Sequence, residues 1–195
     1  MPGPVPSPVV PAAAMAELVT QPLYDSDTCA TAATSVTLFD GTNVTGNRLL
    51  SNLDQAGSLP HPKFFRIGGF RQVLDANIIV SADLAAVANQ NEDVVRFLFG
   101  SYFIFSIGSL KPYLECPAFW IPGGVGPVLR SGNTTAYTQA NGLEQHSNFV
   151  KLRHWLALPP LQSFRAQWTF PTAVTLNNTQ RVWLFLEGEF GREVM

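Results

Sequence analysis

The alternation of hydrophobic and polar residues is most regular near the C-terminal end of the chain. In the segment SFRAQWTF, hydrophobic residues take every second position, at Phe164, Ala166, Trp168 and Phe170. This period of two is typical of a β-strand with one buried face and one solvated face. We therefore predict a strand over residues 163–170.

A second apolar segment follows at residues 182–186. All five positions are hydrophobic, and they include Trp183, Phe185 and Leu186. Continuous apolar strands of this kind are covered on both faces. We predict that this last strand lies between the core and another layer, and a second subunit is one candidate for that layer.

Most of the remaining chain reads as short strands separated by polar loops. We predict strands at five further places, which are residues 31–39, 63–67, 70–80, 114–121 and 149–158. Gly68 and Gly69 separate two of these pieces, and adjacent glycines inside a strand favour a bulge or a sharp bend. Residues 41–62 and 131–147 are rich in turn-forming residues, so we predict long loops there.

A long apolar run in the middle of the chain, at residues 94–107, predicts a central strand. Its buried face would consist of Val95, Phe97, Phe99, Phe103, Phe105 and Ile107. Gly100 and Ser101 interrupt the run and predict a kink. Just before it, the alanine-rich residues 81–89 predict one short helix with Ser81 as its cap.

These elements indicate an all-β fold in one domain. Roughly seven to nine strands with at most two short helices fit a single eight-stranded jelly roll, in which two sheets face each other as a barrel or sandwich. An immunoglobulin-like sandwich is the alternative, but its Cys…Trp…Cys pattern is missing.

The N-terminal segment differs in kind from the rest. Prolines at Pro2, Pro4, Pro6, Pro8 and Pro11 exclude a helix and favour an extended polyproline conformation. At ~3.1 Å per residue, the first eleven residues would reach roughly 30 Å. We predict an extended arm over residues 1–19 that is held by a neighbouring subunit or by the domain's own surface, followed by a single domain over residues 20–195.

Composition indicates a surface that largely contacts other proteins. Charged residues make up 13% of the chain, against about 25% in an average domain. Arginine outnumbers lysine nine to three, and buried interfaces are depleted in lysine and enriched in arginine and aromatic residues. An ordinary β domain with a large core is the alternative explanation. The net charge of −2 and the absence of a basic run exclude a nucleic-acid-binding tail, so we expect no sequence-specific nucleic-acid binding.

No motif typical of an enzyme or a metal site is present in the sequence. The three histidines are scattered, at His61, His146 and His154. Zinc-ligand spacings and a nucleophile elbow are absent. Glu187 and Glu189 share one face of a predicted strand and could hold a divalent ion or two arginines, although plain strand-end polarity explains them more simply. We expect Cys29 and Cys116 to be free thiols, and we expect no catalysis, cofactor or metal.

The closing segment carries a resemblance to a known family. FRAQWTF, a turn region and then RVWLFLEGEFGREV resemble the closing strands of single jelly-roll coat proteins from icosahedral phages with an internal membrane, the sphaerolipovirus-like group. In that family a final apolar strand runs into a Leu-x-Gly element and an arginine followed by a short apolar end. The corresponding positions here are Leu186, Gly188, Arg192 and Val194.

The resemblance implies an upright β-barrel that packs with copies of itself or with a second coat protein over an internal lipid membrane. We therefore expect a structural capsid protein of a bacteriophage virion, made in the host cytoplasm. Two alternatives are a jelly-roll carbohydrate-binding module, with Trp120, Trp155 or Trp168 as its sugar platform, and a virion attachment or spike protein. An outer-membrane barrel would need an export signal, whose pattern the first residues lack.

Overall fold

The computed structural model describes residues 16–41, 47–74, 78–81, 84–108, 112–121, 128–133, 136–140 and 149–193. The five prolines of the predicted arm and Val194 lie outside the described residues. Strands account for 52% of the structure and helix for 10%, which confirms an all-β fold. The described part of the chain contains twelve strands, more than the eight that we predicted.

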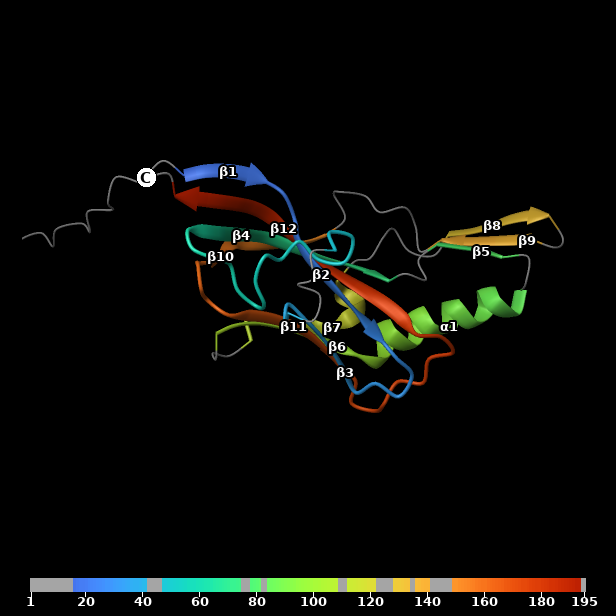
Figure 1. The fold of residues 1–195 in the computed structure, drawn as a ribbon. Helices are drawn as coiled ribbons and strands as arrows, with labels where there is room; N and C mark the ends of the chain where they lie inside the picture. The colour runs from blue at the N-terminus through green and yellow to red at the C-terminus, as the bar shows by residue number, and fades with distance from the viewer. Residues whose placement is uncertain are drawn as a thin grey trace, which may run out of the picture.

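The larger sheet is antiparallel, and the last strand lies near its centre (Figure 1). On one side, β12 (Gln180–Glu193) pairs with β1 (Ala16–Thr20) and β2 (Leu23–Cys29), which follow one another along it. On the other side it pairs with β4 (Lys63–Leu74), whose outer neighbour is β10 (Val150–Leu158). Both edges of the final strand are therefore occupied by strands of the same chain.

The second sheet has the order β3-β11-β6-β7 and is also antiparallel. Its strands are β3 (Ser35–Leu38), β11 (Phe164–Thr169), β6 (Tyr102–Ile107) and β7 (Leu114–Pro117). In β11, buried residues alternate with less buried ones, which confirms the predicted strand with one buried face.

The core lies between the inner faces of these two sheets. Phe70 of β4 packs edge-on against Phe103 and Phe105 of β6, with ring centroids 6.1 and 5.1 Å apart. All three side chains are fully buried. The predicted inward face of residues 103–107 is therefore confirmed.

One polar side chain within the core joins three of its walls. Trp168 of β11 donates its indole N–H to Gln72 Oε1 of β4 at 3.0 Å. Gln72 Nε2 donates to the carbonyls of Ala118 and Ile121, both at 2.8 Å, around the short 3₁₀ helix η2 (Ala118–Trp120). Because buried polar groups need partners, this relay fixes the two sheets and η2 in one arrangement.

The first half of the predicted central strand is a helix, so that prediction is wrong there. Residues 84–100 form α1 (Leu84–Gly100), and β6 begins only at Tyr102. On a helix, residues two apart point in different directions. Phe97 is accordingly buried against Trp168 and Phe170, whereas Phe99 is 70% exposed. The short helix predicted at residues 81–89 instead continues to Gly100.

The predicted irregularity at Gly68 and Gly69 is a bulge within one continuous strand. Along β12, Glu187 lies opposite Gly69 and the next residue, Gly188, lies opposite Ile67, so Gly68 has no opposite residue. The buried residues of β4 change parity across this point, with Phe65 and Ile67 before it and Phe70, Gln72 and Leu74 after it. The bulge thus lets one strand keep its hydrophobic side chains on the core face along its whole length.

A third, smaller sheet is formed by β5 (Ile78–Ser81), β9 (Ala136–Ala140) and β8 (Val128–Asn133), and it lies beside the N-terminal part of α1 (Figure 1). The prediction of a loop at residues 131–147 is therefore wrong where β8 and β9 lie, at residues 131–133 and 136–140. The strand predicted at residues 114–121 ends at Pro117, where η2 begins. The strand predicted at residues 31–39 is limited to β3.

Candidate functional site

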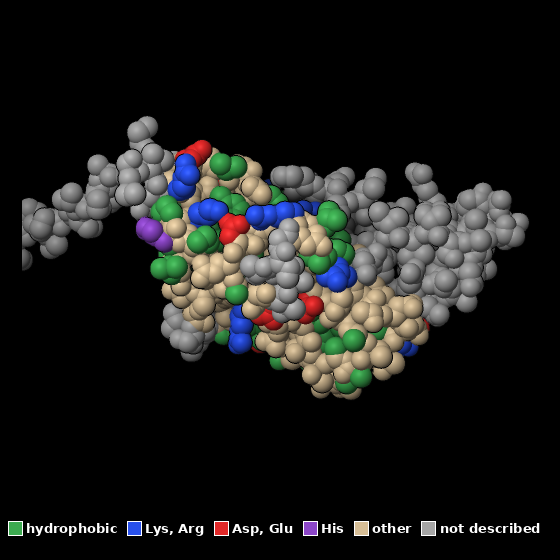
Figure 2. All heavy atoms as spheres, viewed as in Figure 1, with side chains coloured by type: hydrophobic (Ala, Val, Ile, Leu, Met, Phe, Trp, Pro, Cys, Tyr) green, Lys and Arg blue, Asp and Glu red, His purple; other side chains and the backbone are tan. Residues whose placement is uncertain are grey.

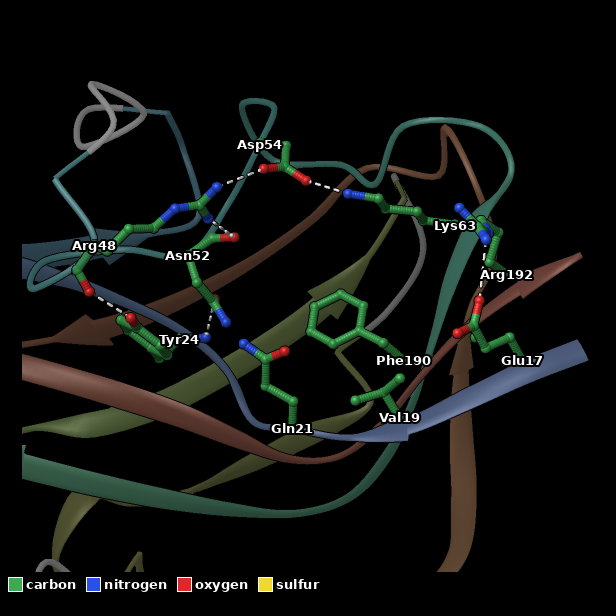
Figure 3. A pocket seen from close by; sticks show the side chains of 11 residues that line it. Glu17, Val19, Gln21, Tyr24, Arg48, Asn52, Asp54, Lys63, Phe190 and Arg192 are labelled. Atoms are coloured by element: carbon green, nitrogen blue, oxygen red, sulfur yellow. Dashed lines mark hydrogen bonds and ion pairs between the residues drawn. The ribbon is translucent and has the colours of Figure 1, made fainter.

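The first candidate site is a groove beside β1, which we call the polar groove (Figure 3). It has a volume of about 570 Å³. β1, β2 and β12 form one side, and the loop over residues 47–62 with the start of β4 forms the other. The lining residues are Glu17, Val19, Gln21, Tyr24, Arg48, Asn52, Asp54, Lys63, Phe190, Gly191 and Arg192.

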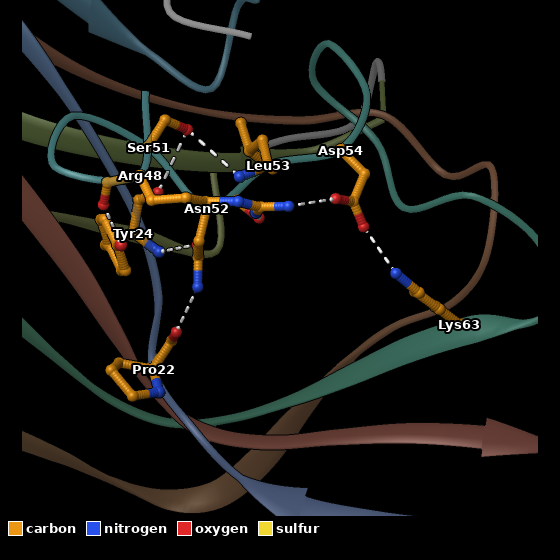
Figure 4. A network of polar contacts seen from close by, with 8 residues as sticks. All are labelled: Pro22, Tyr24, Arg48, Ser51, Asn52, Leu53, Asp54 and Lys63. Carbon is orange, nitrogen blue, oxygen red and sulfur yellow. Dashed lines mark hydrogen bonds and ion pairs between the residues drawn. The ribbon is translucent and has the colours of Figure 1, made fainter. Parts of the chain in front are cut away.

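Asn52 attaches the loop to the outer edge of β2 (Figure 4). Its Oδ1 accepts the Tyr24 N–H at 2.8 Å, its Nδ2 donates to the Pro22 carbonyl at 2.8 Å, and its own N–H donates to the Tyr24 carbonyl at 3.1 Å. Within the described residues, β2 pairs with a strand, β12, on one side only. The bonds from Asn52 satisfy backbone groups on the other side of β2. They also block a sheet edge that could otherwise pair with another chain. Sequence reasoning missed this residue, because its role depends on a strand 28 positions away.

The charged side chains of the polar groove are joined in pairs. Asp54 accepts Arg48 at 3.1 Å and Lys63 at 2.5 Å, and Arg192 contacts Glu17 at 3.0 Å. The hydrogen bond from Lys63, together with Arg48, holds the pKa of Asp54 below its ordinary value. These ion pairs are largely exposed, so each contributes little to stability. The groove offers paired charges and no group with the environment of a nucleophile or a general base.

A second hollow, which we call the Trp155 groove, lies where β10 crosses the bulge of β4. It measures about 390 Å³ and is lined by Thr20, Pro22, Gly68, Phe149, Lys151, Leu152, Trp155, Glu187, Gly188 and Glu189. Between Lys151 and Leu156, β10 has four residues opposite the single residue Gly68. This wide bulge turns Trp155 outward, and its side chain is 56% exposed. His154 belongs to the same bulge and is exposed, so it is not a core residue.

The two acidic residues predicted on one face of the last strand both line the Trp155 groove. Glu187 is buried and forms an ion pair with Arg71 at 2.9 Å, and Arg71 also lies over the Phe185 ring at 4.5 Å. Within the described residues, no group of three or more His, Cys, Asp or Glu side chains could hold a metal ion.

The outer face of β12 is covered in part by the chain itself. The Trp183 indole donates to the Leu49 carbonyl at 3.2 Å, and the Phe185 ring lies 5.5 Å from the Tyr24 ring. Leu186 is buried, and Arg192 lies at the polar groove. The layer predicted on this face of the last strand is therefore supplied in part by the loop around Leu49 and by Tyr24 of the same chain.

Exposed aromatic rings form a third surface feature, the Phe99–Phe119 patch. Phe99 at the end of α1 and Phe119 of η2 stack with centroids 5.1 Å apart and planes at 19°. Their neighbours Val95 and Trp120 are each more than half exposed. Of the three tryptophans considered as a sugar platform, Trp120 and Trp155 are therefore accessible, whereas Trp168 is fully buried and cannot serve.

Charge is distributed evenly over the face shown in Figure 2. Basic and acidic side chains lie near one another, and hydrophobic side chains occur in small separate groups. This view contains no broad basic stretch of the kind that binds nucleic acid.

Both cysteines are free thiols, as predicted. Burial, with Asp27 as a further cause, raises the pKa of Cys29 to about 11, and burial raises the pKa of Cys116 to about 11. Both are therefore protonated near neutral pH and are poor nucleophiles.

Asp25 makes stability depend on pH. Its side chain is 1% exposed, and burial raises its pKa above the ordinary value of 3.8, although hydrogen bonds from the Phe39 and Ser26 amides and from Ser51 oppose the shift. The folded state therefore binds the proton more tightly than the unfolded state, and this contribution to stability is lost as pH rises from about 3.8 through the folded pKa.

We expect Asp25→Asn to remove this pH dependence. The difference in Tm, variant minus wild type, should increase as pH is raised from 3 to 7, because asparagine carries no charge to desolvate and still offers an oxygen to the Phe39 amide. Thermal unfolding of both proteins across this range measures the difference. A constant difference, or one that falls with pH, would contradict the assignment.

No protein-family model, no curated protein and no solved structure matches the chain. No helix in the described residues is both long and apolar enough to cross a membrane.

Proposed function

We propose that this protein is a structural coat subunit with a single jelly-roll domain, which assembles with copies of itself and with other coat proteins into the icosahedral capsid of a bacteriophage virion. The order of the strands supports the jelly-roll part of the proposal. Setting aside β1 and the small third sheet leaves eight strands in two four-stranded sheets, β2-β12-β4-β10 and β3-β11-β6-β7.

Counted in chain order, these eight strands are β2, β3, β4, β6, β7, β10, β11 and β12. In the first sheet β2, the first, lies next to β12, the last, and β4, the third, lies between β12 and β10, the sixth. In the other sheet β3, the second, lies next to β11, the seventh, and β6, the fourth, lies between β11 and β7, the fifth. This nesting of outer strands around inner ones is the pattern of two Greek keys wound into a jelly roll, a fold common in viral capsids, lectins and cupins. It supports the finer description of the fold that we predicted.

A fold alone does not imply a function, so the choice of a coat subunit rests on further features. The resemblance of the closing strands, the low lysine content and the proline-rich segment all favour a protein that is surrounded by other subunits. The Phe99–Phe119 patch and the exposed Trp155 provide apolar contact surfaces on the described part of the domain. Contact with an internal lipid membrane and absence of catalysis belong to the same proposal.

The proposal is tested by the mass of the native assembly. We expect rings, sheets or shells from the full chain by light scattering and negative-stain microscopy, and weaker assembly after removal of residues 1–14. A variant with the five arm prolines replaced by serine keeps the length and serves as the matched control for stiffness. A monodisperse monomer from the full chain at ordinary ionic strength would contradict the coat proposal.

The exposure of Trp120 and Trp155 favours one second candidate, a carbohydrate-binding or virion attachment protein. Exposed tryptophan rings can stack on the apolar faces of sugars. Quenching of tryptophan fluorescence by a sugar, lost in Trp155→Ala or Trp120→Ala, would support this candidate, particularly if the chain stays monomeric.

A further inference from the structure

The Trp155 groove is built so that two aromatic rings lie against the backbone of the sheet. A Cβ atom at position 68 would lie 3.5 Å from the Cη2 and Cζ3 atoms of Trp155, and one at position 69 would lie only 2.2 Å from Cδ2 of Phe149. Gly69 therefore provides the space into which the Phe149 ring packs, whereas the Trp155 ring lies beside Gly68 at an ordinary contact distance. The rings leave an open hollow of about 390 Å³ between β10 and the end of β1.

The chemistry of this hollow fits a proline-rich peptide. The rings of Trp155 and Phe149 and the side chains of Pro22 and Leu152 provide apolar walls. Among the hydrogen bonds within the described residues, none uses the Trp155 indole N–H, whereas the indoles of Trp168 and Trp183 are both bonded. Polyproline segments have no internal hydrogen bonds, so their carbonyls can accept such a donor while their rings pack on aromatic side chains.

The N-terminal segment of the chain has the matching properties. Residues 1–15 carry no charged side chain, so they suit the aromatic walls of this hollow, which has Lys151, Glu187 and Glu189 at its margin, better than the ion-paired polar groove. A polyproline helix has three residues per turn. One ridge of such a helix would consist of Pro2, Val5, Pro8 and Pro11, which are all apolar.

The direction of β1 favours the groove of another copy. Thr20, at the end of β1, lies at the Trp155 groove, while Ala16, at its start, pairs with Glu193 at the other end. Thr20 lies four residues after Ala16, which is about 13 Å at ~3.3 Å per residue. β1 therefore begins at its end farther from the groove, and a segment that continued its direction before Ala16 would extend away from the groove. Return to the same groove would need a reversal, yet residues 12–15 are Ala-Ala-Ala-Met and contain no turn-forming residue.

We propose that the proline-rich segment of one copy, residues 2–11, docks in the Trp155 groove of a neighbouring copy. The inference rests on the proposed self-assembly and names the surface that receives the arm. The contact is heterologous, with different surfaces on the two partners, so it links copies head to tail and closes into rings or extends into sheets according to its geometry.

The test is competition by a peptide of residues 1–14 added to the full chain. Excess peptide should dissociate the assemblies measured by light scattering and should change tryptophan fluorescence. We expect Trp155→Ala to weaken peptide binding by about tenfold or more, as truncation of a central interface tryptophan does. Trp120→Ala is the matched control, since Trp120 is 52% exposed and lies outside the groove. A peptide with serine at the five proline positions should bind much more weakly.

The outcomes separate this inference from the coat proposal. Two results would overturn the docking site and leave the coat proposal standing. Either the particles form normally and are not dissociated by the peptide, or the peptide binds equally well to Trp155→Ala and to wild type. A chain that neither assembles nor binds the peptide would overturn both. Trp155 fluorescence that responds to sugars and not to the peptide would reject the arm in favour of carbohydrate binding. Circular dichroism melting of Trp155→Ala verifies that the variant is folded.

Discussion

Substitution of Gly188 by alanine should abolish stable folding. A Cβ at this position would lie 1.9 Å from the Arg66 carbonyl oxygen and 2.9 Å from its carbonyl carbon. The obstacle is the backbone of the paired strand β4 and cannot rotate away as a side chain would. The β4–β12 pairing, which forms the centre of the larger sheet, would have to separate. We expect a loss of more than about 4 kcal/mol in the free energy of unfolding, which approaches the whole stability of a typical domain.

Urea unfolding and the yield of soluble protein measure this effect, with Gly100→Ala as the matched control. A Cβ at position 100 meets no atom within 4 Å, and Gly100 ends α1. That variant should be unchanged or stabilised by less than about 1 kcal/mol, since alanine favours a helix over glycine. Equal midpoints for Gly188→Ala and wild type would show that the two strands do not approach as closely as described.

Gly188 also illustrates how a sequence pattern acquires a physical meaning. In the sequence, the Leu-x-Gly element is only part of a resemblance, and the structure shows a physical reason for its leucine and its glycine. Leu186 is buried in the core, and Gly188 lies where β4 and β12 shift register around the bulge at Gly68. No side chain fits at that crossing, so glycine is required there whatever the function of the chain.

The sequence predicted those strands whose environment matches their local pattern. Residues 164–169 alternate because one face contacts the core and the other does not. The strand prediction was wrong for residues 94–100, because apolar residues at every second position are also compatible with a helix when each faces a different surface. Phe97 faces the core and Phe99 faces solvent, and only the packing of α1 distinguishes them.

The candidate surfaces were less predictable than the fold. Trp155 is exposed because β10 has four residues opposite one residue of β4. Asn52 covers an edge of β2 through its hydrogen bonds to the backbone of that strand. Both depend on strands that are distant in the sequence. Composition nevertheless indicated exposed aromatic surface, and the Phe99–Phe119 patch and Trp155 are surface of that kind.

Asp93 holds the connection between the two sheets in place, and its loss should be nearly as damaging as that of Gly188. It lies on α1 and is fully buried. Its Oδ1 accepts the Asn177 N–H at 2.6 Å, and its Oδ2 accepts the Asn178 N–H at 2.9 Å and Gln180 Nε2 at 3.3 Å. One carboxylate thus fixes the chain just before β12 begins.

Replacement of Asp93 by alanine would leave these donors without their acceptor. We expect a loss of about 3 to 5 kcal/mol, since hydrogen bonds to a charged acceptor are strong and unsatisfied buried donors are costly. Asp93→Asn keeps one oxygen and the same shape, so its loss should be smaller. Glu92→Ala is the matched neighbour: Glu92 is exposed and contacts Arg96 at 2.5 Å, so this variant should lose less than about 1 kcal/mol.

Urea unfolding ranks the three variants, and hydrogen exchange locates the effect. The amides of Asn177 and Asn178 should exchange faster in Asp93→Ala, while amides in β6 and β11 should change only as far as global stability does. An Asp93→Asn variant more stable than wild type would mean that the cost of burying the charge exceeds the strength of its hydrogen bonds. In that case Asp93 would be retained to fix the path of the chain into β12 and not to stabilise the domain.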